Sequence, residues 1–163
     1  MKIRAIGVVA VLALSLTACG QDEEAASKAI SDSIMESNDQ TFEVTQDEAD
    51  CVGDGMVDKI GVDKLTEYGI ITEDLKANDG IDNVEMSEGD AGSAADVMSD
   101  CANIKELFTS AMGDLPEEAQ QCVDENLSDE VLHDFLVAVF MNDQEGGQQD
   151  LMGALQECIT PGG

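Results

Sequence analysis

The stretch TQDEADCVGDGMVDKIG, residues 45–61, identifies the fold class of the chain most clearly. Thr45 and Glu48 form a capping box, in which the threonine oxygen accepts the amide hydrogen of Glu48 and the glutamate reaches back to the amide of Thr45. Apolar residues then recur three or four positions apart, at Ala49, Val52, Met56 and Ile60. Gly61 suits the left-handed backbone position that follows a helix. The stretch therefore predicts an amphipathic helix.

Similar signals predict helices along the rest of the chain. Helical spacing of apolar residues, with caps and terminal glycines or prolines, marks helices over roughly 24–36, 62–68, 94–101, 104–112, 116–123, 128–140 and 151–158. Ser93 is the expected cap of the helix that starts at residue 94. Residues 76–92 (KANDGIDNVEMSEGDAG) show no period and many turn formers, so we expect a long loop. Because no strand alternation of useful length occurs, we predict an all-α domain, a small helical bundle.

The N-terminus has the features expected of an export signal. Two positively charged residues, Lys2 and Arg4, lie at the start of the chain. An apolar run of 12 residues follows over 5–16. A membrane-spanning helix needs about 20 apolar residues, whereas the apolar region of a signal peptide has about 7–15. Leu16-Thr17-Ala18-Cys19 then resembles the lipobox of bacterial lipoproteins. The resemblance implies cleavage before Cys19 and attachment of a diacylglyceryl group to its thiol.

We therefore expect residues 1–18 to be a lipoprotein signal peptide, residues 19–40 an acylated tether with a short helix, and residues 41–163 the compact helical domain. Two acyl chains anchor a protein stably, whereas one chain does so only marginally. The expected location is the outer face of the cell membrane. Since Gly20 rather than an aspartate follows the cysteine, the resemblance points to the outer membrane in a host that has one.

The mature chain is strongly acidic and poor in aromatic residues. Without Lys2 and Arg4, five basic residues remain against 36 acidic ones, a formal charge of −31. Proteins bind nucleic acids through Lys and Arg that neutralise phosphates, so this charge excludes nucleic acids as partners. The chain has no Trp, one Tyr and four Phe. Its core must therefore be built from aliphatic residues and methionine.

Four cysteines remain after Cys19, namely Cys51, Cys101, Cys122 and Cys158. An even number of cysteines in an exported chain implies disulfides, and four cysteines allow three connectivities. Zinc sites favour cysteine pairs that are about two to four residues apart, so the wide spacing here argues against a metal site made of four thiolates.

A weak internal repeat selects among the connectivities. Cys51-Val52 opens one unit and Cys122-Val123 opens another, and the segments 94–101 and 151–158 close them with similar patterns of apolar and polar positions. Duplicated units should each close on themselves, over about 45–113 and 114–160. We therefore predict the disulfides Cys51–Cys101 and Cys122–Cys158, which would staple two related helical hairpins.

Two stretches of the body, DEADCVGDGMVDKIGVDKLTEYGI (47–70) and LPEEAQQCVDENLSDEVLHDFLVAVF (115–140), resemble uncharacterised four-cysteine helical lipoproteins and secreted proteins of actinobacteria. The resemblance implies export and a helical body, and it implies no activity.

The sequence indicates a protein that is not an enzyme. Catalysis needs a nucleophile or base with a partner, or a metal. The single histidine, His133, lies beside Leu132 but off the apolar stripe of its helix, as a partly exposed structural histidine does. The chain has no G-x-S-x-G, Walker or dinucleotide-binding motif. Paired carboxylates are so frequent that no single pair indicates an active site.

Calcium is the cofactor that the acidic loop could hold. The candidate ligands are Asp79, Asp82, Glu85, Glu88 and Asp90, and Gly53-Asp54-Gly55 is a second oxygen-rich stretch with glycines. An EF-hand alignment on Gly80 fails because it places Leu75, Ala77 and Met86 at ligand positions. An irregular calcium site in the loop stays open as an alternative.

We expect a non-enzymatic interaction or binding module, held at the cell envelope by the lipid on Cys19, whose partner is an envelope protein or a ligand. Two alternatives stay open. One is a divalent-cation binding protein that uses the loop over residues 77–90. The other is a small-molecule binder in a cleft between the two helical units, and this alternative predicts an apolar pocket.

Overall fold

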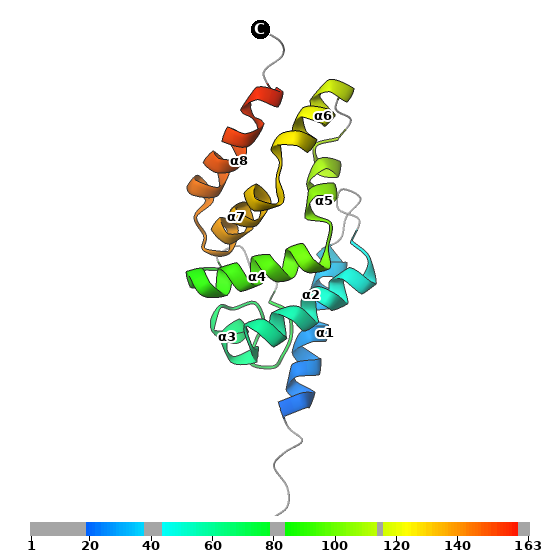
Figure 1. Ribbon diagram of the computed structural model, residues 1–163. Coiled ribbons are helices and arrows are strands. Elements are labelled where there is room, and N and C mark those ends of the chain that lie inside the picture. The colour runs from blue at the N-terminus through cyan, green and yellow to red at the C-terminus, as the bar shows by residue number, and fades with distance from the viewer. Residues whose placement is uncertain (1–18, 38–43, 79–83, 114–115, 160–163) are drawn as a thin grey trace, which may run out of the picture.

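The computed structural model describes residues 19–37, 44–78, 84–113 and 116–159 of the chain. These residues form eight helices and no strand, apart from an isolated bridge between Ile71 and Ala77 (Figure 1). The helices are α1 (Cys19–Ser37), α2 (Gln46–Lys59), α3 (Val62–Glu67), α4 (Glu88–Cys101), α5 (Ile104–Ala111), α6 (Glu117–Asn126), α7 (Asp129–Phe140) and α8 (Gln144–Ile159). The predicted all-α bundle is confirmed. None of the helices in these residues is long and apolar enough to cross a membrane.

Helix α2 has the caps that its sequence predicts. The Thr45 side chain accepts the Glu48 amide, and Glu48 accepts the Thr45 amide at 2.8 Å, which completes the capping box. Gly61 follows the C-cap with a φ of 88°, in the left-handed region that only glycine adopts without strain. The short helix α3 follows and ends before Gly69, whose φ is 72°.

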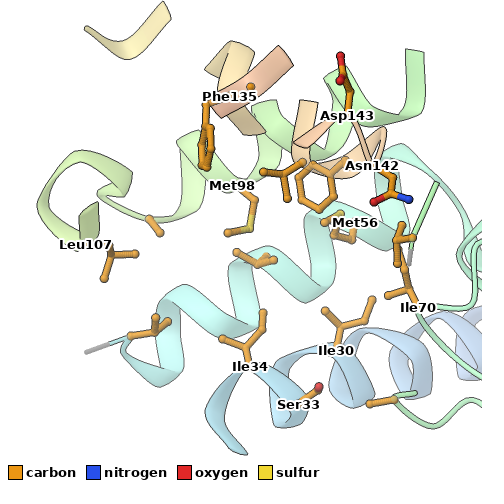
Figure 2. A pocket seen from close by; sticks show the side chains of 18 of the residues that line it. Ile30, Ser33, Ile34, Met56, Ile70, Met98, Leu107, Phe135, Asn142 and Asp143 are labelled. Carbon is orange, nitrogen blue, oxygen red and sulfur yellow. The ribbon is translucent and has the colours of Figure 1, made fainter. Parts of the chain in front are cut away.

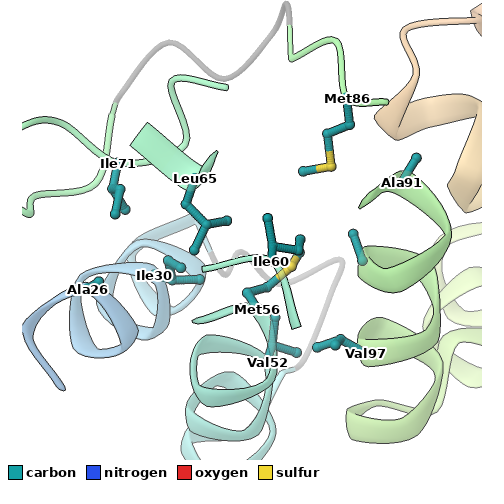
Figure 3. Packing of buried hydrophobic residues seen from close by; sticks show 11 residues of the cluster. Ala26, Ile30, Val52, Met56, Ile60, Leu65, Ile71, Met86, Ala91 and Val97 are labelled. Atoms are coloured by element: carbon teal, nitrogen blue, oxygen red, sulfur yellow. The ribbon is translucent and has the colours of Figure 1, made fainter. Parts of the chain in front are cut away.

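The main core lies where α1, α2, α3 and α4 meet (Figure 3). Its buried residues are Ala26, Ile30, Val52, Met56, Ile60, Leu65, Ile71, Met86, Ala91, Ala94 and Val97. No tryptophan or phenylalanine is among these residues, and methionines fill positions between the helices, as the composition predicts.

Helix α1 belongs to this core, so the compact domain begins before Thr41. Ala26 is fully buried, Ile30 is 6% exposed, and the helix starts at Cys19 rather than near residue 24. The expected tether over 19–40 is therefore, in residues 19–37, a helix packed on α2. The serines of α1 explain why the sequence pattern missed this contact. Buried Ser27 and Ser31 donate hydrogen bonds to Asp54 and Asp50 of α2, so polar residues face the interior.

Two glycines of α2 allow its neighbours to approach closely. A Cβ atom added at Gly53 would collide with the backbone carbonyl oxygen of Ser27 in α1. A Cβ atom added at Gly55 would lie 2.7 Å from a methyl group of Val97 in α4. The stretch Gly53-Asp54-Gly55 is therefore a packing site inside a helix, and Asp54 is engaged by Ser27.

A second, smaller core lies among α5, α6, α7 and α8. Its buried residues are Val123, Leu127, Leu132, Leu151 and Leu155. Ile104 and Phe108 of α5 and its C-cap Met112 pack against this cluster, so α5 belongs by packing to the second half rather than to a unit ending near residue 113. The two halves lie one above the other, and the start of α1 and the end of α8 are at opposite ends of the molecule (Figure 1).

The disulfides join the predicted pairs. Cys51 of α2 bonds to Cys101 of α4 with a Cα–Cα distance of 5.5 Å, and Cys122 of α6 bonds to Cys158 of α8 at 5.4 Å. Each bond therefore connects the second helix of its half to the last, and both bonds join the pairs that the internal repeat predicts.

The start of α4 differs from the prediction. The N-cap is Ser87, whose hydroxyl accepts the amide of Asp90, and Ser93 lies inside the helix with its hydroxyl donating to the carbonyl of Gly89. The expected loop over 76–92 therefore ends at residue 87. The sequence did not predict the first turns of α4, because Gly89 and Gly92 lie there and glycine is unfavourable in helix interiors.

Replacing Gly53 by alanine should destabilise the protein, whereas the same change at Gly92 should not. In Gly53→Ala the added methyl group would force α1 away from α2, at a cost of about 1–3 kcal/mol. Gly92, inside α4, has no atom within 4 Å of an added Cβ, so alanine there should stabilise by about 0.5–1 kcal/mol. Thermal unfolding of the two variants checks this, and a Gly53→Ala protein as stable as Gly92→Ala would contradict the close contact.

Candidate functional site

A large apolar cavity lies between the two halves of the molecule (Figure 2). Its volume is about 620 Å³, and α1, α2, α4, α5, α7, α8 and the connections between them line it. The apolar lining residues are Ile30, Ile34, Val44, Val52, Met56, Ile70, Ala77, Val84, Met98, Ala102, Leu107, Phe135, Val139 and Phe140. The apolar pocket expected for a small-molecule binder between the helical units is therefore present.

In the first half, the helix faces that form the main core also line the cavity. Val52 and Met56 lie one turn apart on α2 and are almost fully buried. Ile30 and Ile34 lie one turn apart on α1 and line the same space. Because these residues have helical spacing, one apolar face of each helix serves both the core and the cavity.

Helix α7 forms the opposite wall. Phe135, Val139 and Phe140 line the cavity, and Phe135 makes an edge-to-face contact with Phe108 of α5, with ring centroids 6.3 Å apart. The end of α7 is fixed to the first half, because the amide of Met86 donates to the carbonyl of Phe140 at 2.9 Å. Val139 remains 44% exposed, so this wall reaches the surface.

Polar residues stand at the edges of the cavity. Exposed Asn142, Asp143 and Gln148 come from the α7–α8 turn and the first turns of α8, and half-buried Ser33 comes from α1. Figure 2 shows Asp143 pointing away from the apolar side chains. We call Asn142, Asp143 and Gln148 the mouth of the cavity.

Hydrogen bonds fix the backbone conformation at the mouth. Asn142 has a left-handed φ of 58°, and the amide of Asp143 donates to the carbonyl of Ala138 at 2.8 Å. Asp143 Oδ1 accepts the amide of Gly146 at 3.1 Å and so caps the start of α8. Gly147 permits the close contact with α7, because an added Cβ would lie 2.8 Å from the Cβ of Ala138.

The residues predicted as calcium ligands do not come together in the described part of the chain. Asp79 and Asp82 lie outside the described residues, and Glu85 and Glu88 are exposed. Asp90 is 9% exposed and bound by other side chains. Within residues 19–37, 44–78, 84–113 and 116–159, no group of three or more His, Cys, Asp or Glu side chains is arranged to hold a metal ion.

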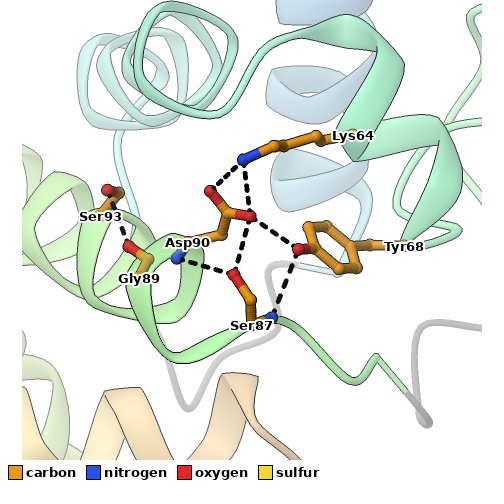
Figure 4. Close-up of polar contacts among 6 residues, drawn as sticks. All are labelled: Lys64, Tyr68, Ser87, Gly89, Asp90 and Ser93. Atoms are coloured by element: carbon orange, nitrogen blue, oxygen red, sulfur yellow. Dashed lines mark hydrogen bonds and ion pairs between the residues drawn. The ribbon is translucent and has the colours of Figure 1, made fainter.

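Asp90 is the centre of a polar cluster that joins α3 to α4 (Figure 4). Its carboxylate accepts hydrogen bonds from Lys64 Nζ at 2.8 Å, from Tyr68 Oη at 2.6 Å and from Ser87 Oγ at 2.9 Å. The ammonium of Lys64 first, and then the two hydroxyls, lower the pKa of Asp90 to about 2. Asp90 therefore has a structural role.

The structure also places the predicted histidine and the predicted lipidation site. His133 is partly exposed, as predicted, and bridges α7 to α4 through a 3.2 Å contact between its Nε2 and Asp96 Oδ1. Cys19 is the first residue of α1. Residues 1–18, the expected signal peptide, lie outside the described residues.

In comparisons with protein-family models, with curated proteins and with solved structures, nothing matches this chain.

Replacing Asp90 by asparagine should change the dependence of stability on pH. The folded pKa of about 2 lies below the ordinary unfolded value of about 3.9. The charge of Asp90 therefore contributes stability that is present above about pH 4 and is lost as the pH falls towards 2. We expect Asp90→Asn to lower the unfolding midpoint at pH 7, and the difference from the wild type to shrink between about pH 4 and pH 2.

Glu88→Gln is the matched control, since it removes one negative charge from an exposed position in the same turn of α4. Thermal melts from pH 7 to pH 2 measure both variants against the wild type. A difference for Asp90→Asn that stays constant over this range would contradict the assignment of Asp90 as an ionised partner of Lys64.

Proposed function

We propose that this protein is a non-enzymatic binding module that holds a small apolar molecule in the cavity between its two helical halves. The observation that carries the proposal is the cavity itself, about 620 Å³ of space lined by apolar side chains from both halves. Ligand sites in proteins are clefts of about 300–1,000 Å³ with mostly apolar walls and a few polar groups.

The arrangement of the walls supports a small ligand more than a protein partner. A ligand in the cavity would contact nearly buried Val52 and Met56 on one side and the aromatic rings of Phe135 and Phe140 on the other. Apolar surface that a ligand covers there contributes about 25 cal/mol per Å² to binding. Surface residues of a partner could reach only the mouth and exposed Val139.

We also propose that the protein is exported and anchored to the outer face of the cell membrane by a diacylglyceryl group on Cys19. Helix α1 starts at Cys19 and its first core residue is Ala26. An α-helix rises about 1.5 Å per residue, so the core would begin about 10 Å from the lipid. The packed domain would then stand directly on the membrane, with the α5–α8 half farthest from it (Figure 1).

The cavity is tested with N-phenyl-1-naphthylamine, an uncharged dye whose fluorescence rises in apolar sites. Both core clusters and their packed neighbours lie within residues 26–158, so the oxidised chain from Gly20 contains them all. We expect saturable binding of the dye. Ala102→Leu adds bulk to the wall and should weaken binding about tenfold, equivalent to about 1.4 kcal/mol.

Ala111→Leu is the matched control, because Ala111 is exposed at the end of α5 and does not line the cavity. It should bind the dye as the wild type does. Ala77→Leu is a second variant that fills the same cavity, from another part of its wall. Unchanged dye affinity in both filled variants, with normal thermal melts, would contradict a ligand in this cavity.

The lipid anchor is tested by mass spectrometry of the intact protein extracted from membranes. We expect a chain that begins at Cys19 and carries a diacylglyceryl group. Cys19→Ser should abolish the modification because it removes the thiol to which the group attaches. A mature chain with an unmodified Cys19 would contradict the anchor.

A further inference from the structure

We infer that the cavity selects ligands whose polar end is uncharged and rejects those with a carboxylate. This inference rests on the proposed function and deepens it by naming the class of ligand. The occupant is an apolar chain or ring system with a hydroxyl, carbonyl or amide group at the mouth.

The cavity offers a carboxylate no positive partner. Its lining residues in the described part of the chain include no Lys, Arg or His, and their one ionisable side chain is Asp143. Exposed Lys76, next in sequence to the lining residue Ala77, does not itself line the cavity. A carboxylate that entered the apolar interior would be desolvated without compensation, which is strongly unfavourable.

Three of the five basic residues of the chain from Cys19 are engaged by carboxylates. Lys64 binds Asp90 at 2.8 Å, Lys28 binds Asp32 at 2.8 Å, and Lys105 lies 3.8 Å from Asp124. The formal charge of the chain from Cys19 is −31. The field of the protein therefore repels an anion even when its charged end stays in water outside the mouth.

The start of α8 is the place at the mouth where backbone amides could attract an anion. The protein uses this position itself, because the carboxylate of Asp143 accepts the amide of Gly146 at 3.1 Å. Asp143 thus satisfies the helix start and leaves a negative charge beside the opening. Asn142 and Gln148 provide amide groups that donate to and accept from an uncharged polar group.

The test compares 1-decanol with decanoate, two chains of equal length, as competitors of the bound dye at pH 8 and low ionic strength. We expect decanol to displace the dye at a concentration about tenfold lower than decanoate does. Added salt should narrow the difference, since it screens the repulsion between decanoate and the acidic protein.

Asp143→Asn tests the role of the mouth, because asparagine keeps the helix-capping oxygen and removes the charge. We expect the preference for decanol to fall roughly threefold, through tighter binding of decanoate. Asp150→Asn is the matched control, since Asp150 is exposed on the same helix and does not line the cavity. It should leave the preference unchanged.

The outcomes separate this inference from the function on which it rests. Decanoate that displaces the dye as well as decanol does, or displacement by neither chain, overturns the inference while dye binding still supports the cavity as a ligand site. Failure of the dye itself to bind overturns both.

Discussion

Helix α2 lies between α1 and α4, and the contacts on its two sides depend on Gly53 and Gly55. Successive residues of a helix are about 100° apart, so positions that differ by two face nearly opposite directions. Gly53 faces the backbone of α1 and Gly55 faces Val97 of α4. Two neighbours can therefore approach α2 from opposite sides, and Ser27 and Ser31 of α1 donate hydrogen bonds to Asp54 and Asp50 across the first of these contacts.

The same geometry positions the cavity. Val52 and Met56 lie on the face of α2 between the directions of the two glycines, and both line the cavity. Helices α1 and α4 occupy the sides of α2, and a helix of the second half lies across the cavity from this third face. That helix is α7, and the carbonyl of Phe140 at its end accepts the amide of Met86. The space between α7 and α2 is the cavity.

Local chemistry made the helices predictable, because caps, terminal glycines and the spacing of apolar residues act within short stretches. The disulfide pairing was predictable from the internal repeat, in which Cys51 and Cys122 open equivalent units. Apolar periodicity marked the helix over 24–36, but not how closely it docks, since Ser27 and Ser31 count as polar and lie in the interior with hydrogen bonds to Asp54 and Asp50. The cavity was foreseen only as a consequence of one functional hypothesis. The apolar stripe of α7 includes its lining residues, but a stripe does not show whether its partner lies in contact or across a space.

The two disulfides stabilise the halves on either side of the cavity. They close chain segments of 50 and 36 residues, and in the chain-entropy model each contributes about 4 kcal/mol by restricting the unfolded state. Cys51–Cys101 lies within the first half and Cys122–Cys158 within the second, so neither crosses the cavity between them. Each half is thus stabilised internally, while α7 joins the halves through the Met86–Phe140 hydrogen bond and the contact between His133 and Asp96 of α4.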